Sequence, residues 1–133
     1  DVSQKLEIYK KISTIENLED LYAVEEEIED RFGEIPQSIY NLLTISHIRA
    51  LASKIPFSNI SQVREGFILD FHEQHFLSPE KIVNISKEYP RGIKVNAGNR
   101  PHILLYYNNQ SDRIRNKLVQ LESFLVKISS LNK

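Results

Sequence analysis

The hydrophobic periodicity of the chain changes near its middle, and this change limits the fold more than any other feature. Up to about residue 54 the apolar residues recur every three or four positions, which is typical of helices that bury one face. Further on, Phe67, Leu69 and Phe71 occupy every second position, which is typical of a strand. Helices followed by short strands and further helices indicate the α+β class.

The first part predicts three helices. Residues 2–13 form the first, and its apolar stripe, expected to be buried, consists of Val2, Leu6, Tyr9 and Ile12. Asn17 suits the N-cap of a second helix, and Gly33 suits the position just after its end. The third helix covers about 37–54 and ends before Pro56.

The second part predicts a ββαββα order with two hairpins, a small antiparallel sheet and helices on one face. Gly66 suits the turn of the first hairpin. A short helix is expected over 79–88, and a final helix after Ser111 or Asp112 carries one apolar face made of Ile114, Leu118, Leu121, Leu125 and Ile128. We expect a single domain over 1–133, with a helical part of about 1–56 and a sheet-plus-helix part of about 57–133.

The composition excludes several kinds of site. With no cysteine, disulfides and thiolate metal sites cannot form. The four glycines fit neither the Walker A spacing nor the dinucleotide fingerprint. No apolar run is long enough to span a membrane, and no signal peptide is visible, so a cytoplasmic location is expected. Since the chain has no methionine, we expect a processed chain or a piece of a longer protein.

Catalytic and metal sites have weak support. His72 and His75 are three positions apart at the end of a strand, whereas zinc-binding histidines of the zincin type are four apart on a helix. No third ligand is obvious, so we interpret the two histidines as surface residues at the end of a strand rather than as metal ligands. No serine lies in a nucleophile elbow, although a remote arrangement of histidines and acids stays open. We therefore expect no enzyme activity and no cofactor.

The charges are unevenly distributed. Residues 1–34 hold eleven acidic and four basic residues, a net charge of −7, and the rest of the chain carries +6. One end of the domain could face a basic partner, or two solvated faces of opposite sign could simply aid solubility.

A candidate docking patch lies on the second helix. Glu27, Asp30 and Arg31 are spaced i, i+3 and i+4, so they share a face that borders the buried stripe. Held rigidly beside the core, these charges would form a specific docking surface. The alternative is an ordinary solvated helix face.

The second half suggests another kind of partner. Residues 81–117 hold eight basic and only two acidic residues, interleaved with tyrosines, which resembles a weak nucleic-acid footprint. The possible contacts are Lys94, Arg100, Arg113 and Arg115. The isoelectric point of about 6.5 argues against this alternative.

One stretch resembles a known family. Residues 29–36, Glu-Asp-Arg-Phe-Gly-Glu-Ile-Pro, followed by Asn41-Leu42-Leu43 and Arg49, resemble the C-terminal domain of the bacterial transcription-repair coupling factors (Mfd). Residues 6–12 are similar to the opening helix of that domain. The resemblance is sharpest over 6–50, and Ile35 replaces the expected leucine with little change in volume.

The resemblance implies a regulatory role. The full-length family protein is an ATP-driven DNA translocase that removes stalled RNA polymerase and recruits the excision-repair protein UvrA. Its C-terminal domain would dock on the UvrB-like module of the same chain, mask the UvrA-binding surface and be released when polymerase is engaged. The charged positions of the family interface match Glu27, Asp30 and Arg31. Contact with UvrA, RNA polymerase and DNA would run through the parent protein, and the isolated domain would be monomeric.

Overall fold

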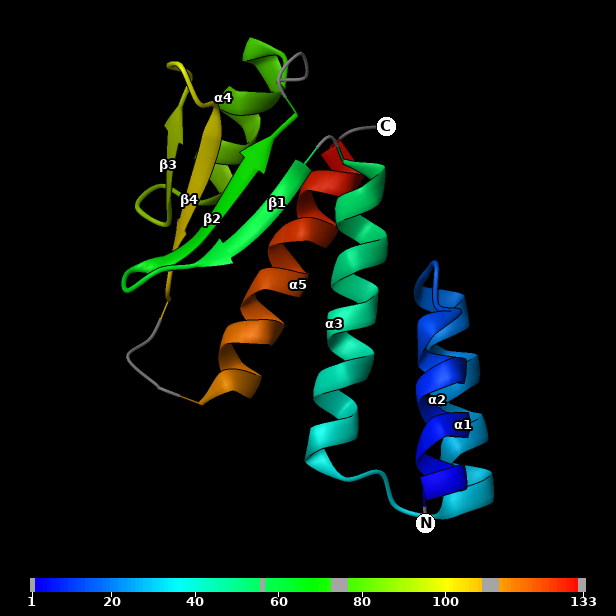
Figure 1. Ribbon diagram of the computed structural model, residues 1–133. Helices are drawn as coiled ribbons and strands as arrows, with labels where there is room; N and C mark the ends of the chain where they lie inside the picture. Colours follow the sequence, from blue (N-terminus) through cyan, green and yellow to red (C-terminus); the bar gives the residue numbers. More distant parts are fainter. Residues whose placement is uncertain (1, 56, 73–76, 109–112, 132–133) are drawn as a thin grey trace. The chain divides into compact units, whose positions relative to one another are not determined.

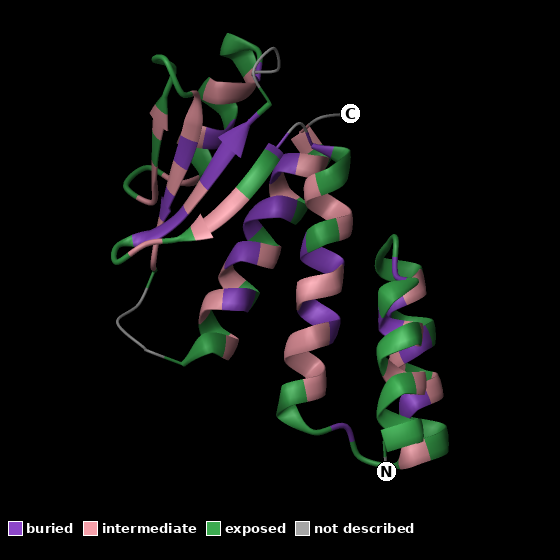
Figure 2. Cartoon of the chain, viewed as in Figure 1, coloured by how far each residue is buried: buried purple, intermediate pink, exposed green. Residues whose placement is uncertain are grey.

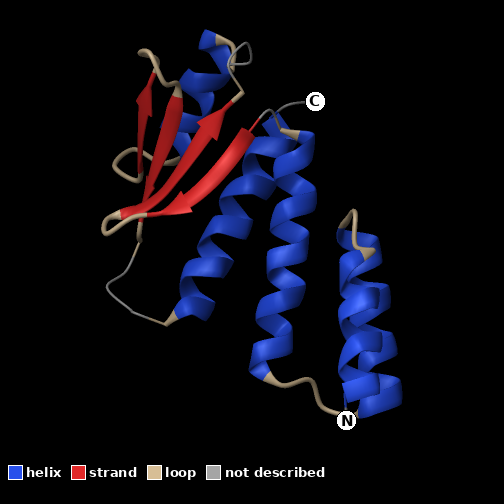
Figure 3. Cartoon of the chain, in the orientation of Figure 1, coloured by secondary structure: helices blue, strands red, loops and turns tan. Residues whose placement is uncertain are grey.

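The structure is a computed structural model that describes residues 2–55, 57–72, 77–108 and 113–131 (Figure 1). The chain divides into two compact units, Asp1–Leu51 and Ala52–Lys133. The elements follow the expected order of three helices and then ββαββα (Figure 3). They are α1 (Val2–Ser13), α2 (Leu18–Phe32), α3 (Gln37–Lys54), β1 (Phe57–Gln62), β2 (Gly66–Phe71), α4 (Pro79–Glu88), β3 (Ile93–Asn96), β4 (His102–Tyr106) and α5 (Ile114–Leu131). The mixed α+β class is confirmed.

The first unit begins with a hairpin of two helices, and the second of them, α2, is capped as expected. The Asn17 side chain accepts a hydrogen bond from the backbone N–H of Asp20 at 2.8 Å, which satisfies one free donor of the first turn of α2. Gly33 has a φ of +87° and donates its N–H to the carbonyl of Glu29 at 2.9 Å. Glycine suits this position because it adopts positive φ without steric cost.

The core of this unit lies between the three helices, but α1 contributes a different face from the one expected. The buried residues are Ile12, Ile15, Leu21, Val24, Ile28, Ile35 and Leu43, and Ile8 packs against them. The expected stripe is wrong except for Ile12: Val2, Leu6 and Tyr9 are 74, 55 and 46% exposed. Positions 8 and 12 lie roughly a third of a turn away from that stripe, and it is this side that faces α2.

The second unit contains a four-stranded antiparallel sheet in the order β1-β2-β4-β3. The two central strands pair Phe67 with Leu105 and Leu69 with Ile103, and all four side chains are buried. Side chains opposite each other in a pleated sheet point to the same face. This pairing therefore builds one continuous apolar face.

Helices α4 and α5 pack on each other and cover that face, as Figures 1 and 2 show. The expected stripe of α5 is confirmed for Leu118, Leu121, Leu125 and Ile128. Ile114, however, is 48% exposed at the start of the helix. The fully buried Phe124 was not anticipated; its ring meets that of Tyr89, at the end of α4, edge-on at 5.2 Å.

Gly66 is needed for a close approach of two strands rather than for a turn. Among the described residues positive φ occurs at Gly33 and not at Gly66, which is the first residue of β2. A Cβ atom on Gly66 would lie 1.9 Å from the carbonyl oxygen of Leu105. Only a residue without a side chain fits against the neighbouring backbone here.

We expect Gly66→Ala to lower the free energy of unfolding by about 2 kcal/mol or more, because the backbone of β4 must shift to admit the methyl group. Urea denaturation of the chain measures this loss. Gly98→Ala is the matched control, since its Cβ would meet the end of the Asn96 side chain at 3.1 Å, and a smaller loss is expected. Equal urea midpoints for Gly66→Ala and the unmodified chain would contradict the packing argument.

Candidate functional site

Four charged side chains join α1 to α2 along one edge of the hairpin. Lys11 Nζ lies 2.6 Å from Glu27 Oε1, and Arg31 forms an ion pair with Glu7. Both helices carry a glutamate followed four residues later by a cation, the favourable order for a helical pair. Because the helices run antiparallel, each charge meets an opposite charge both along its own helix and across the seam. We call these four residues the charged quartet.

The ion pair between Glu7 and Arg31 changes the protonation equilibria of both groups. The hydrogen bond from Arg31, helped by the charges of Arg31 and Lys11, lowers the pKa of Glu7 below its usual value. The hydrogen bond to Glu7 and its negative charge raise the pKa of Arg31 further. The Arg31 guanidinium also lies 5.1 Å from the centroid of the Phe32 ring. Arg31 is therefore held by two contacts within the hairpin.

The opposite edge of α2 faces the start of α3. Tyr40 donates its hydroxyl hydrogen to Glu29 Oε1 at 3.4 Å. Burial of the phenol, with the negative charges of Glu25 and Glu29, raises the pKa of Tyr40. Two of the four sides of α2 are thus occupied by polar contacts inside the unit, and a third side is buried in the core.

The remaining side of α2 points outward. It carries Tyr22, Glu26 and Asp30 at intervals of four residues, and all three are exposed. Tyr22 is 60% exposed. We call these three residues the outer strip of α2. An acidic strip with one exposed aromatic ring has the chemistry of a protein-docking surface for a basic partner.

The three residues expected to form the docking patch therefore have different environments. Glu27 and Arg31 belong to the charged quartet, whereas Asp30 belongs to the outer strip. The sequence-based reasoning missed the partners Glu7 and Lys11. Their i, i+4 spacing on an adjacent antiparallel helix was the signal that could have revealed them.

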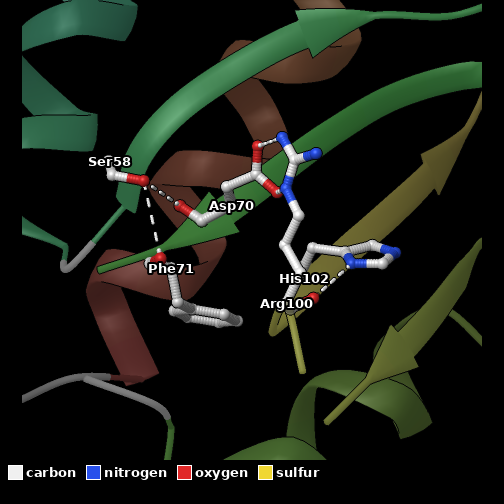
Figure 4. A network of polar contacts seen from close by, with 5 residues as sticks. All are labelled: Ser58, Asp70, Phe71, Arg100 and His102. Carbon is white, nitrogen blue, oxygen red and sulfur yellow. Dashed lines mark hydrogen bonds and ion pairs between the residues drawn. The ribbon is translucent and has the colours of Figure 1, made fainter. Parts of the chain in front are cut away.

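In the basic half, Arg100 has a structural partner. Its Nε and Nη2 atoms donate to Asp70 Oδ1 and Oδ2 at 3.1 and 2.9 Å, and Asp70 is only 5% exposed (Figure 4). Ser58 and His102 make further backbone contacts in this network: Ser58 Oγ donates to the carbonyls of Asp70 and Phe71, and His102 Nδ1 lies 2.8 Å from the Arg100 carbonyl. A bidentate guanidinium compensates a carboxylate that would otherwise be buried without a counter-charge.

The other basic candidates are spread over separate elements. Lys94 is exposed on β3, Arg113 is exposed just before α5, and Arg115 is half-buried in the first turn of α5. Tyr107 is half-buried, with its ring edge-on to Phe67 and the Lys117 ammonium 4.7 Å above it. Nucleic-acid binding by this half stays a prediction.

The same unit has a groove of about 510 Å³ between α5 and the end of β4. Its lining includes Tyr89, Arg91, Tyr106, Asn116, Gln120 and Ser123. Gln120 holds the chain after β4 in place, since it donates to the Tyr106 carbonyl at 2.6 Å and accepts from the Asn108 N–H at 3.2 Å.

Within the described part of the chain, no three histidine, cysteine, aspartate or glutamate side chains come together in a way that could hold a metal ion. His72 is exposed at the end of β2, and His75 lies outside the described residues. None of the described helices is both long and apolar enough to cross a membrane.

Comparison with known proteins identifies the family. The family model of the TRCF domain matches residues 1–82, which is more than half of the chain. The chain belongs to the TRCF domain family.

The TRCF domain relatives are bacterial proteins named transcription-repair-coupling factor. The protein from Rickettsia conorii is 27% identical over 98% of this chain, and the one from Escherichia coli is 24% identical over 86%. The chain spans about a tenth of the length of these relatives, 11% and 10% respectively. The crystal structure of the C-terminal domain of transcription-repair coupling factor aligns with 100% of this chain and 85% of that one, with a TM-score of 0.73 at 23% identity, which shows a shared fold.

Arg100→Ala is expected to lower the free energy of unfolding by about 1–3 kcal/mol, because it leaves the buried Asp70 carboxylate without its charged donor. Thermal and urea denaturation measure the loss. Lys94→Ala, at an exposed position on β3, serves as the control and should change stability by less than about 0.5 kcal/mol. Adding Asp70→Asn to Arg100→Ala should recover part of the loss; if the two single losses simply add, the pair is not a coupled unit.

The lowered pKa of Glu7 predicts a pH dependence of the hairpin. Its ion pair stabilises the fold fully above the usual glutamate pKa of about 4.3 and is lost as the pH falls through the lower folded value. NMR titration of the Glu7 carboxyl should give a pKa below that of a free glutamate. In Arg31→Gln the value should return toward the usual one; an unchanged titration curve would show that Arg31 is not the cause.

Proposed function

We propose that this chain is a non-catalytic docking domain of a transcription-repair coupling factor. In this proposal it rests on the UvrB-like module of the parent protein, masks the surface that binds UvrA, and restrains the DNA translocase until RNA polymerase is engaged. The observation that carries the proposal is the outer strip of α2, an exposed acidic surface with an aromatic ring on a rigid helix.

Support also comes from the way α2 is held. The charged quartet and the contact of Tyr40 with Glu29 fix α2 on two sides, so the outer strip is presented without much loss of conformational entropy on docking. Within this proposal Asp30 makes the direct contact to a basic surface. Glu27 and Arg31 contribute chiefly by positioning α2. The solvent-exposed parts of their side chains border the docked partner.

A contact of this size is suited to a reversible clamp. A few charged contacts bind weakly between separate molecules, but tethering within one protein raises the effective concentration to about millimolar. Weak docking then suffices to keep the domain closed. A competing partner opens it when its preference for the open state amounts to a few kcal/mol.

The proposal is tested on the full-length parent protein by measuring its affinity for UvrA. Glu26→Gln together with Asp30→Asn should tighten UvrA binding by about fivefold or more, since the loss of about 1 kcal/mol of docking energy shifts the closed state by that factor. Removing residues 1–133 should tighten it further.

Glu65→Gln provides the matched control. It removes one exposed acid, in the turn between β1 and β2, and leaves α2 and the charged quartet intact, so UvrA binding should stay near that of the unmodified protein. If UvrA affinity is the same with and without residues 1–133, the masking role is wrong. Salt-dependent binding of duplex DNA by the isolated chain would then favour the nucleic-acid alternative.

A further inference from the structure

The outward face of α1 is apolar and basic, in contrast to the acidic outer strip of α2. Val2, Leu6 and Tyr9 lie at i, i+4 and i+7, so they form one stripe along the helix, and they are 74, 55 and 46% exposed. In Figure 2 most of the length of α1 is drawn in the colour of exposed residues. Scattered exposed apolar residues are ordinary, but a stripe at helical spacing is the signature of a helix that packs on another surface.

The charges around this stripe have one sign. On the helix surface Lys5 and Lys10 lie on either side of the stripe, and both are exposed. In the part of the chain that the structure describes, neither lysine forms an ion pair. The single acid of α1, Glu7, is turned toward α2 and paired with Arg31. Among the charged side chains of α1, only the cations Lys5 and Lys10 border the apolar stripe, on a unit that is otherwise strongly acidic.

We propose that the face formed by Val2, Lys5, Leu6, Tyr9 and Lys10 docks an amphipathic helix whose apolar stripe is flanked by aspartate or glutamate. A straight helix of 12 residues, about 18 Å long, offers ridges and grooves that match those of a second helix. Acidic residues beside the partner's apolar stripe would pair with the two lysines.

This surface is separate from the one in the proposed function. The wheel positions of Val2, Leu6 and Tyr9 lie away from the edge that carries Glu7 and Lys11, through which α1 contacts α2. The hairpin can therefore hold a basic surface on α2 and an acidic helix on α1 at the same time. The two sites do not depend on each other, so failure of one leaves the other intact.

The test uses two designed peptides of about 20 residues, long enough to be helical in water, with the same leucine stripe flanked either by glutamate or by lysine. Fluorescence anisotropy with the full chain should show binding of the glutamate peptide and at least about tenfold weaker binding of the lysine peptide. The preference should shrink as salt is added. Lys5→Glu with Lys10→Glu should reverse it.

Leu6→Gln should weaken binding of the glutamate peptide by about tenfold, because it removes one apolar anchor while keeping a good helix former. Val126→Gln, a change at a 46% exposed residue of α5, is the matched control and should have no effect. Circular dichroism should show both variants folded, since neither side chain is in the core.

Three results would overturn the proposal: no binding of either peptide, binding that ignores the reversal of Lys5 and Lys10, or binding that Leu6→Gln leaves unchanged. If the glutamate peptide does not bind, but vesicles with anionic lipid bind the chain and lose that binding in Leu6→Gln, the face is assigned to a membrane instead. If neither peptide binds, but the chain self-associates and Leu6→Gln abolishes that self-association, the face is assigned to a second copy of the chain.

Discussion

The apolar seam between α1 and α2 determines where the charged side chains of these two helices point. Once Ile12 packs with Val24 and Ile28, the helical repeat fixes the direction of all other positions on both helices. Glu27 and Arg31 are brought to one edge and Glu29 to the other, which leaves Asp30 facing outward. The surface chemistry of this unit is therefore a consequence of which apolar residues meet in its core.

The helices and their ends could be predicted because their signals are local. Asn17 and Gly33 act within a few residues of their own positions, and the strand periodicity near Phe67 is visible in a short window. The error on α1 has a physical cause. The helix carries two apolar stripes, and only the packing of α2 and α3 selects the one that contains Ile8 and Ile12.

The site was harder to predict because its interactions connect distant parts of the chain. Arg100 looked available for a phosphate, but it lies in the loop before β4 and is paired with Asp70 on β2, 30 positions away in sequence. Glu7 and Arg31 are 24 positions apart. A charge pattern read along the sequence shows which signs are present, whereas the fold decides which of them neutralise one another and which stay at the surface.

The antiparallel arrangement of the charged quartet also fixes the two helices along their axes. If α1 slid by one turn in one direction, Glu7 would come opposite Glu27; if it slid the other way, Lys11 would come opposite Arg31. The packing of the isoleucine and valine side chains already opposes such slippage, and the facing like charges would add to its cost. The quartet therefore favours one axial register of α1 against α2. A partner on either outward face then meets residues at constant spacing.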